Sequence, residues 1–62
     1  VPVTLPDSES CHVVIYLGNE KLADKTLPGG GSQVIQVTGP KGDQMLDVYI
    51  DGNKTSGTYT FN

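Results

Sequence analysis

The sequence predicts an all-β protein, a small antiparallel β-sandwich of about six short strands. The first observation is compositional: eight glycines and four prolines accompany many Val, Thr and Tyr residues, which is typical of strands and turns. The second is that apolar residues alternate with polar ones at a period of two. No window repeats apolar residues at the i, i+3, i+4, i+7 spacing of an amphipathic helix, so no helix is expected.

Six segments follow this alternation and are separated by turn residues. The segment 11–17 is the most apolar and is expected to be the central strand, whereas Pro2 lacks an N–H for a ladder and confines the first strand to an edge. Short strands at roughly ten-residue spacing are typical of an immunoglobulin-like sandwich, here smaller than a full seven-stranded domain. The expected strands cover residues 1–5, 11–17, 20–27, 33–38, 44–50 and 55–61.

The connections carry the residue types of tight turns. Gly18-Asn19 and Asp51-Gly52 tolerate positive φ and predict two-residue hairpins, the second being the stronger signal. Residues 28–32, a proline, three glycines and a serine, are expected to form a flexible connection. Residues 39–43 predict one further reversal.

Length and charge limit the organisation and the partners. A chain of 62 residues holds one domain, so residues 1–62 are expected to form a single module. Because Val1 is not an initiator Met, we expect this module to belong to a longer protein. The net charge of −3 lacks the basic footprint that nucleic acid requires, and no stretch approaches the ~20 apolar residues of a membrane span.

The residues that could support catalysis are few. His12 is the only histidine and is expected on the surface, and no serine is flanked like a nucleophile elbow. Cys11 is the only cysteine, which excludes an intrachain disulfide and favours a small buried hydrophobe over a reactive thiol. The sequence therefore predicts no enzyme, no catalytic residue and no cofactor.

Three other patterns have competing interpretations. Asp43, Asp47 and Asp51 recur every four residues, but strands would spread them apart, so a shared metal ion is not expected. The run 29–31 resembles a phosphate-binding loop only in its glycines, and a linker or turn is favoured. Residues 53–55 match the N-glycosylation pattern beside a hairpin, where a turn is the favoured interpretation.

An outer face remains as a binding surface. Alternation places His12 and Tyr16 on the side of their strand away from the core, and Tyr49 on the corresponding side of its own strand. Aromatic rings on an exposed sheet face are what a sugar platform needs. His12, Tyr16 and Tyr49 are therefore the candidate surface-binding residues, and exposed strand edges add the prospect of weak self-association as a homodimer.

Short motifs spread over nearly the whole chain resemble one family. These motifs are Val3-Thr4-Leu5-Pro6, His12-Val13-Val14-Ile15-Tyr16, Asp24-Lys25, Gly39-Pro40-Lys41-Gly42, the segment 47–52 and Tyr59-Thr60-Phe61. Through them the sequence resembles the C-terminal module of Gram-positive transmembrane serine/threonine kinases that carry PASTA repeats. The resemblance implies an immunoglobulin-like β domain on the extracellular or cell-envelope side, tethered through a parent membrane protein, after repeats that sense peptidoglycan.

Three functions are compatible with these features. The first is a non-catalytic accessory module of such a receptor kinase that contributes to cell-wall sensing, with cell-wall glycan, peptidoglycan fragments or another protein as partner. The kinase motifs themselves are missing from this sequence, so kinase activity does not carry over. The second is a polysaccharide-binding or adhesin-type module of an envelope protein, and the third is a purely structural spacer.

Overall fold

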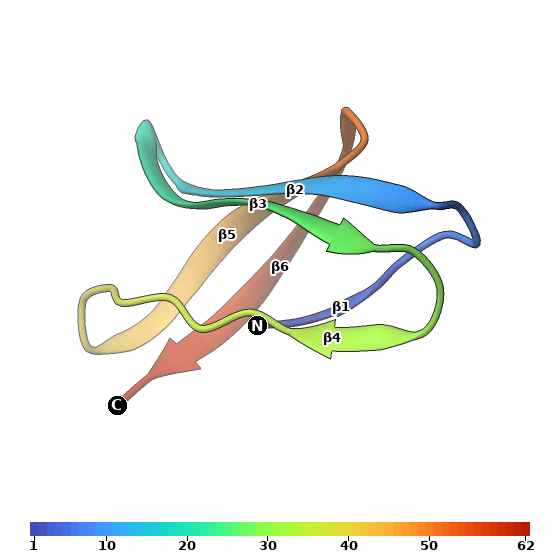
Figure 1. Ribbon diagram of the computed structural model, residues 1–62. Coiled ribbons are helices and arrows are strands. Elements are labelled where there is room, and N and C mark those ends of the chain that lie inside the picture. The colour runs from blue at the N-terminus through green and yellow to red at the C-terminus, as the bar shows by residue number, and fades with distance from the viewer.

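The computed structural model describes residues 1–62 and contains six strands in two antiparallel sheets (Figure 1). This confirms the expected all-β fold, a small antiparallel β-sandwich. No helix is long and apolar enough to cross a membrane. The strands are β1 (Pro2–Thr4), β2 (Ser10–Leu17), β3 (Glu20–Pro28), β4 (Ser32–Val34), β5 (Gly42–Ile50) and β6 (Asn53–Phe61).

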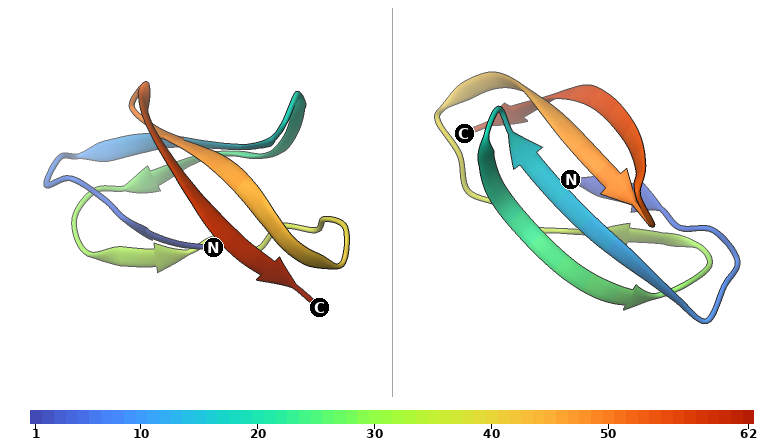
Figure 2. Two further views of the ribbon diagram at one scale, coloured as in Figure 1. Left: turned by 180° about the vertical axis from the view of Figure 1, so that it is seen from behind. Right: turned by 90° about the horizontal axis from the view of Figure 1, so that it is seen from above.

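The larger sheet has four strands in the order β3-β2-β5-β6. As expected, β2 has a neighbour on both sides, pairing Val13 with Ile50 and Ile15 with Val48 on β5. In Figure 2 this sheet is strongly twisted, so that β5 and β6 run obliquely to β2 and β3. The right-handed twist of strands is the general cause of such a shape.

The smaller sheet pairs β1 with β4 and lies across one face of the larger sheet (Figures 1 and 2). β1 has one partner strand, which agrees with the expectation that Pro2 confines it to an edge. The core fills the space between the two sheets, and the opposite face of the four-stranded sheet is called the outer face below. Nine residues form the core: Val3, Leu5, Cys11, Val13, Ile15, Ala23, Ile35, Leu46 and Val48.

Cys11 is fully buried in this core, where the sequence predicts a small buried hydrophobe. Its Sγ lies 3.3 Å from Ser8 Oγ and 3.8 Å from the carbonyl oxygen of Pro6. Both groups belong to the polar turn that leads into β2. The thiol therefore also ties this turn to the core, since a cysteine can donate and accept weak hydrogen bonds.

Both predicted hairpins form, with different turn types. Asp51 and Gly52 have φ of 50° and 85°, the two positive values that a type I′ turn requires, and they close the β5–β6 hairpin. In the β2–β3 hairpin only Gly18 has a positive φ, of 61°, as in a type II′ turn. Each turn thus has the residue type that its backbone needs.

A β-bulge interrupts the pairing of β2 with β3. Tyr16 pairs with Lys21 but Ile15 pairs with Ala23, so Leu22 is an extra residue on β3. A one-residue shift reverses the face to which the following side chains point. As a result Ala23 is buried against the core and Asp24 lies on the outer face, opposite Val14.

The run of glycines after β3 forms a turn that is hydrogen-bonded to the segment before β2. Gly30 donates its N–H to the carbonyl of Pro6 at 2.8 Å, and Gly31 accepts from the N–H of Leu5 at 2.9 Å. An added Cβ on Gly29 would lie 2.0 Å from the carbonyl oxygen of Ser8. The turn therefore packs backbone against backbone, which only glycine allows.

The fourth strand is shorter than expected, and the last two begin earlier. Pairing along β4 ends at Val34 rather than at residue 38, because its partner β1 begins at Pro2. Beyond it, Ile35 still donates its N–H to the carbonyl of Val1 at 2.8 Å. β5 begins at Gly42 and β6 at Asn53, each two residues before the expected start, since their hairpin continues to both ends.

Candidate functional site

The outer face of the four-stranded sheet brings the three predicted surface residues together. Val14 of β2 pairs with Tyr49 of β5, and directly opposed residues of an antiparallel pair project from the same face. His12 and Tyr16 flank Val14 at two-residue spacing and therefore project from this face too. The structure thus places His12, Tyr16 and Tyr49 side by side, although the sequence separates Tyr49 from the other two by more than thirty residues.

The two tyrosines contact each other edge to face. Their ring centroids are 5.9 Å apart and the ring planes are inclined by 83°. This is one of the favoured geometries of an aromatic pair, because the positive edge of one ring meets the negative face of the other. Both side chains remain partly exposed, so the pair presents apolar ring surface to solvent.

Beside the tyrosines, His12 is grouped with Lys21 and Asp24, two residues that the sequence did not indicate as members of a site. His12 Nε2 is hydrogen-bonded to Asp24 Oδ1, and Lys21 Nζ donates to Asp24 Oδ2 at 3.1 Å. The hydrogen bond with His12, followed by that from Lys21, lowers the pKa of the Asp24 carboxyl. The hydrogen bond to Asp24 in turn raises the pKa of the Lys21 ammonium.

We expect replacement of His12 by alanine to raise the pKa of Asp24 toward its ordinary value of about 3.9. Lys21→Ala should also raise it, since the hydrogen bond from Lys21 is the second cause of the lowered pKa. Carboxyl carbon shifts followed by NMR during a pH titration measure both changes. Lys25→Ala, which removes a lysine from the same strand, is the control and should leave the titration of Asp24 unchanged.

The lowered pKa of the Asp24 carboxyl also makes the stability of the fold depend on pH. Because the carboxyl is more acidic in the folded chain, its contribution is present above the unfolded value of about 3.9 and is lost as pH falls through the folded pKa. The contribution is small, since Asp24 is exposed. A titration in which Asp24 follows the unfolded peptide would contradict the hydrogen bonds assigned to it.

Together these side chains line a shallow hollow of about 480 Å³ on the outer face, called the aromatic hollow below. Its lining combines two aromatic rings, an imidazole, a carboxylate and an ammonium group. No serine, threonine or cysteine is among its lining residues. The residues of the aromatic hollow are His12, Val14, Tyr16, Lys21, Asp24, Tyr49 and Gly52.

The position of His12 is fixed by the turn between β5 and β6. The N–H of His12 donates to Asp51 Oδ1 at 2.9 Å, and the N–H of Asp51 donates to the carbonyl of His12 at 2.9 Å. This reciprocal pair ties β2 to the Asp51-Gly52 turn at the rim of the aromatic hollow. The Asp51 carboxylate is thereby used as a backbone acceptor.

Asp43 and Asp47, which with Asp51 recur every four residues in the sequence, also have separate partners. Asp43 accepts a hydrogen bond from Thr60 Oγ1 at 2.6 Å, and Asp47 accepts one from Ser56 Oγ at 2.7 Å. Lys54 Nζ lies 3.9 Å from Asp47. No three His, Cys, Asp or Glu side chains are grouped as metal ligands would be.

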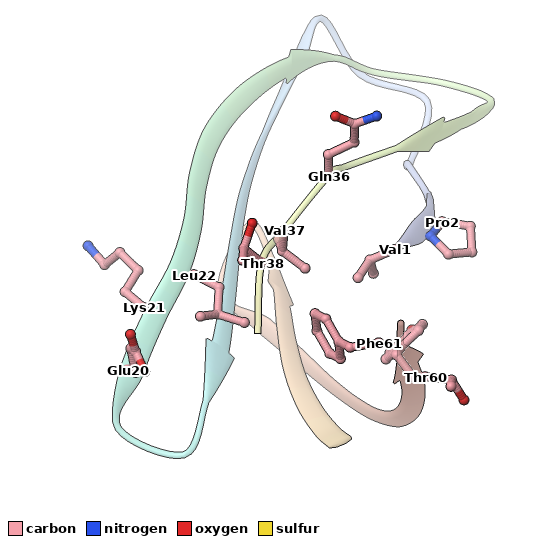
Figure 3. A pocket seen from close by; sticks show the side chains of 11 residues that line it. Val1, Pro2, Glu20, Lys21, Leu22, Gln36, Val37, Thr38, Thr60 and Phe61 are labelled. Carbon is pink, nitrogen blue, oxygen red and sulfur yellow. The ribbon is translucent and has the colours of Figure 1, made fainter. Parts of the chain in front are cut away.

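A second hollow, of about 910 Å³, opens where the smaller sheet ends (Figure 3). Its lining comes from Val1 and Pro2, the start of β3, the segment after β4 and the end of β6. Leu22, Val37 and Phe61 supply apolar surface there, and Phe61 also packs its ring against Gly39. This hollow lies beside the core, and Lys21 is the one lining residue that it shares with the aromatic hollow.

No family model, curated protein or solved structure matches this chain.

Proposed function

We propose that this chain is a non-catalytic binding module that contributes to cell-wall sensing at the C-terminus of a PASTA-type receptor serine/threonine kinase, outside the cytoplasm. The resemblance of its motifs to that module supports the proposal. The observation that carries the binding role is the aromatic hollow, in which Tyr16 and Tyr49 lie beside the group formed by His12, Asp24 and Lys21.

The chemistry of the aromatic hollow fits a fragment of cell-wall glycan. A sugar ring presents apolar C–H groups on its faces and hydroxyls at its edge, and an aromatic ring contacts the former. Asp24 and His12 can bond the hydroxyls, because a carboxylate accepts and an imidazole both donates and accepts. Lys21 supplies a positive charge for the carboxylates of peptidoglycan stem peptides. The hollow is shallow, so affinity is expected to be modest.

Truncating one tyrosine tests this role. We expect Tyr49→Ala to weaken binding of soluble peptidoglycan fragments about tenfold or more, because it removes ring surface from the centre of the hollow. Calorimetric titration measures the change. Met45→Ala is the matched control, since Met45 lies on the same face of β5 but outside the hollow. Equal affinity of the two variants would contradict the proposal.

The exposed tyrosine pair also favours a second candidate function, that of a polysaccharide-binding or adhesin-type module of another envelope protein. The two candidate functions differ in the ligand that the hollow would bind. Binding of neutral polysaccharide as strong as that of peptidoglycan fragments would favour this alternative, since neither Lys21 nor a stem peptide would then matter. Binding of neither, with unchanged signalling by a receptor ectodomain that lacks the module, would leave a structural spacer.

A further inference from the structure

The two edges of the four-stranded sheet differ in charge. β3, at one edge, carries Glu20, Lys21, Asp24 and Lys25 along its length. Charged side chains discourage an edge strand from pairing with another chain. β6, at the other edge, has nine residues and only Lys54 is charged, so that the segment 55–61 is rich in Thr and aromatic residues and carries no charge.

The backbone of β6 has a free row of hydrogen-bonding groups. The two-residue turn makes Ile50 and Asn53 a hydrogen-bonded pair, and such pairs alternate along an antiparallel ladder. The odd-numbered residues of β6 therefore bond to β5. The N–H and C=O groups of Ser56, Thr58 and Thr60 point away from the sheet, where β6 has no neighbour.

We propose that β6 pairs antiparallel with β6 of a second copy of this chain, about a two-fold axis at Thr58. The two copies of Thr58 are then opposed, and Ser56 of one copy lies opposite Thr60 of the other. On the inner face, Gly57 of one copy lies opposite Tyr59 of the other, so the two tyrosines do not collide. This inference concerns a surface separate from the aromatic hollow and stands independently of the proposed function.

Charge is compatible with this register. No charged side chain of one β6 lies opposite a charge of like sign on the other, which would oppose pairing. Asp43 and Asp47 belong to β5, where Thr60 and Ser56 donate to them. Between the two copies Asp47 and Asp43 are three strand spacings apart, about 14 Å, beyond the screening length of about 8 Å at physiological ionic strength.

The pairing joins two four-stranded sheets into a continuous sheet of eight strands. An axis perpendicular to the sheet keeps both outer faces on the same side, so the two aromatic hollows face the same way. Edge pairing through one strand buries little area, which makes the dimer weak and dependent on concentration. A ligand with repeated units, such as a glycan chain, could engage both hollows and bind more tightly than a single unit.

Sedimentation at increasing concentration tests the dimer. We expect the unmodified chain to shift from monomer toward dimer and Thr58→Lys to remain monomeric over the same range, with association weakened about tenfold or more by the two opposed lysines. Thr26→Lys is the matched control, because Thr26 is an exposed threonine on the other edge strand. It should dimerise like the unmodified chain.

Amide hydrogen exchange provides a second test that needs no variant. The amides of Ser56, Thr58 and Thr60 should exchange rapidly in dilute solution and become protected in concentrated solution, while those of Gly57 and Tyr59 are protected in both. A chain that stays monomeric at every concentration would overturn the proposal. A dimer that survives Thr58→Lys unchanged would also overturn it, since the contact would then lie elsewhere.

Discussion

Replacing Gly29 with alanine is expected to remove a large part of the stability of the fold. The new Cβ would lie 2.0 Å from the carbonyl oxygen of Ser8, a distance at which the backbone must move. That movement would disturb the hydrogen bonds of Gly30 and Gly31 to residues 5 and 6. Overpacking costs about 1–3 kcal/mol and occasionally more, and a collision with backbone at this distance belongs at the upper end of that range, whereas a core of this size rarely supplies more than about 3–5 kcal/mol.

Urea denaturation, monitored by circular dichroism, measures the stability that Gly29→Ala loses. Gly31→Ala is the control, because its Cβ would meet nothing within 4 Å and only its φ of 72° disfavours a side chain. That substitution should cost about 1–2 kcal/mol. If the alanine at position 29 were tolerated as well as that at position 31, the close contact between the two turns would be wrong.

Replacing Ile15 with alanine is expected to cost about 2–5 kcal/mol of stability, the usual range for such a truncation in a core. Ile15 is among the largest fully buried side chains and lies on the central strand β2, between Ala23 of β3 and Val48 of β5. The cavity left by the truncation cannot easily close, because β3 and β5 are both held in place by their backbone hydrogen bonds to β2. Thermal unfolding of the unmodified chain and of the Ile15→Ala variant measures this loss of stability.

Met45→Ala serves as the comparison for this loss. Met45 lies on the outer face of β5 and its residue surface is 66% exposed, so its truncation should change stability by less than about 0.5 kcal/mol. Similar losses for the two variants would contradict the division of the sheet into an inner and an outer face. A large difference would support it without any reference to a ligand.

Much of the fold could be predicted because side-chain alternation and turn chemistry agree. The apolar residues of β2 specify a central strand, and Asp51-Gly52 forms the type I′ turn that its residue types favour. The length of β4 could not be predicted, because it depends on where its partner β1 begins. The contacts of the glycine turn could not be predicted either, since Gly29 packs against Ser8, twenty-one residues earlier in the chain.

The site was predicted in part, for a similar reason. His12, Tyr16 and Tyr49 follow from alternation along two strands and lie on the outer face. Lys21 and Asp24 were missed as members of the hollow. A regular hairpin closed at Gly18-Asn19 would have turned Asp24 toward the core, and only the bulge at Leu22 turns it toward His12. A bulge depends on packing across strands, which the polar sequence of β3 does not indicate.

The most direct measurement of the central claim, that the outer face is a binding surface, is an NMR titration of the labelled chain with soluble peptidoglycan fragments. We expect saturable shift changes confined to the aromatic hollow, with His12, Tyr16 and Tyr49 at their centre. Changes centred on Val37 and Phe61 would place the ligand in the other hollow. That result, or a spectrum that does not change, would contradict the claim.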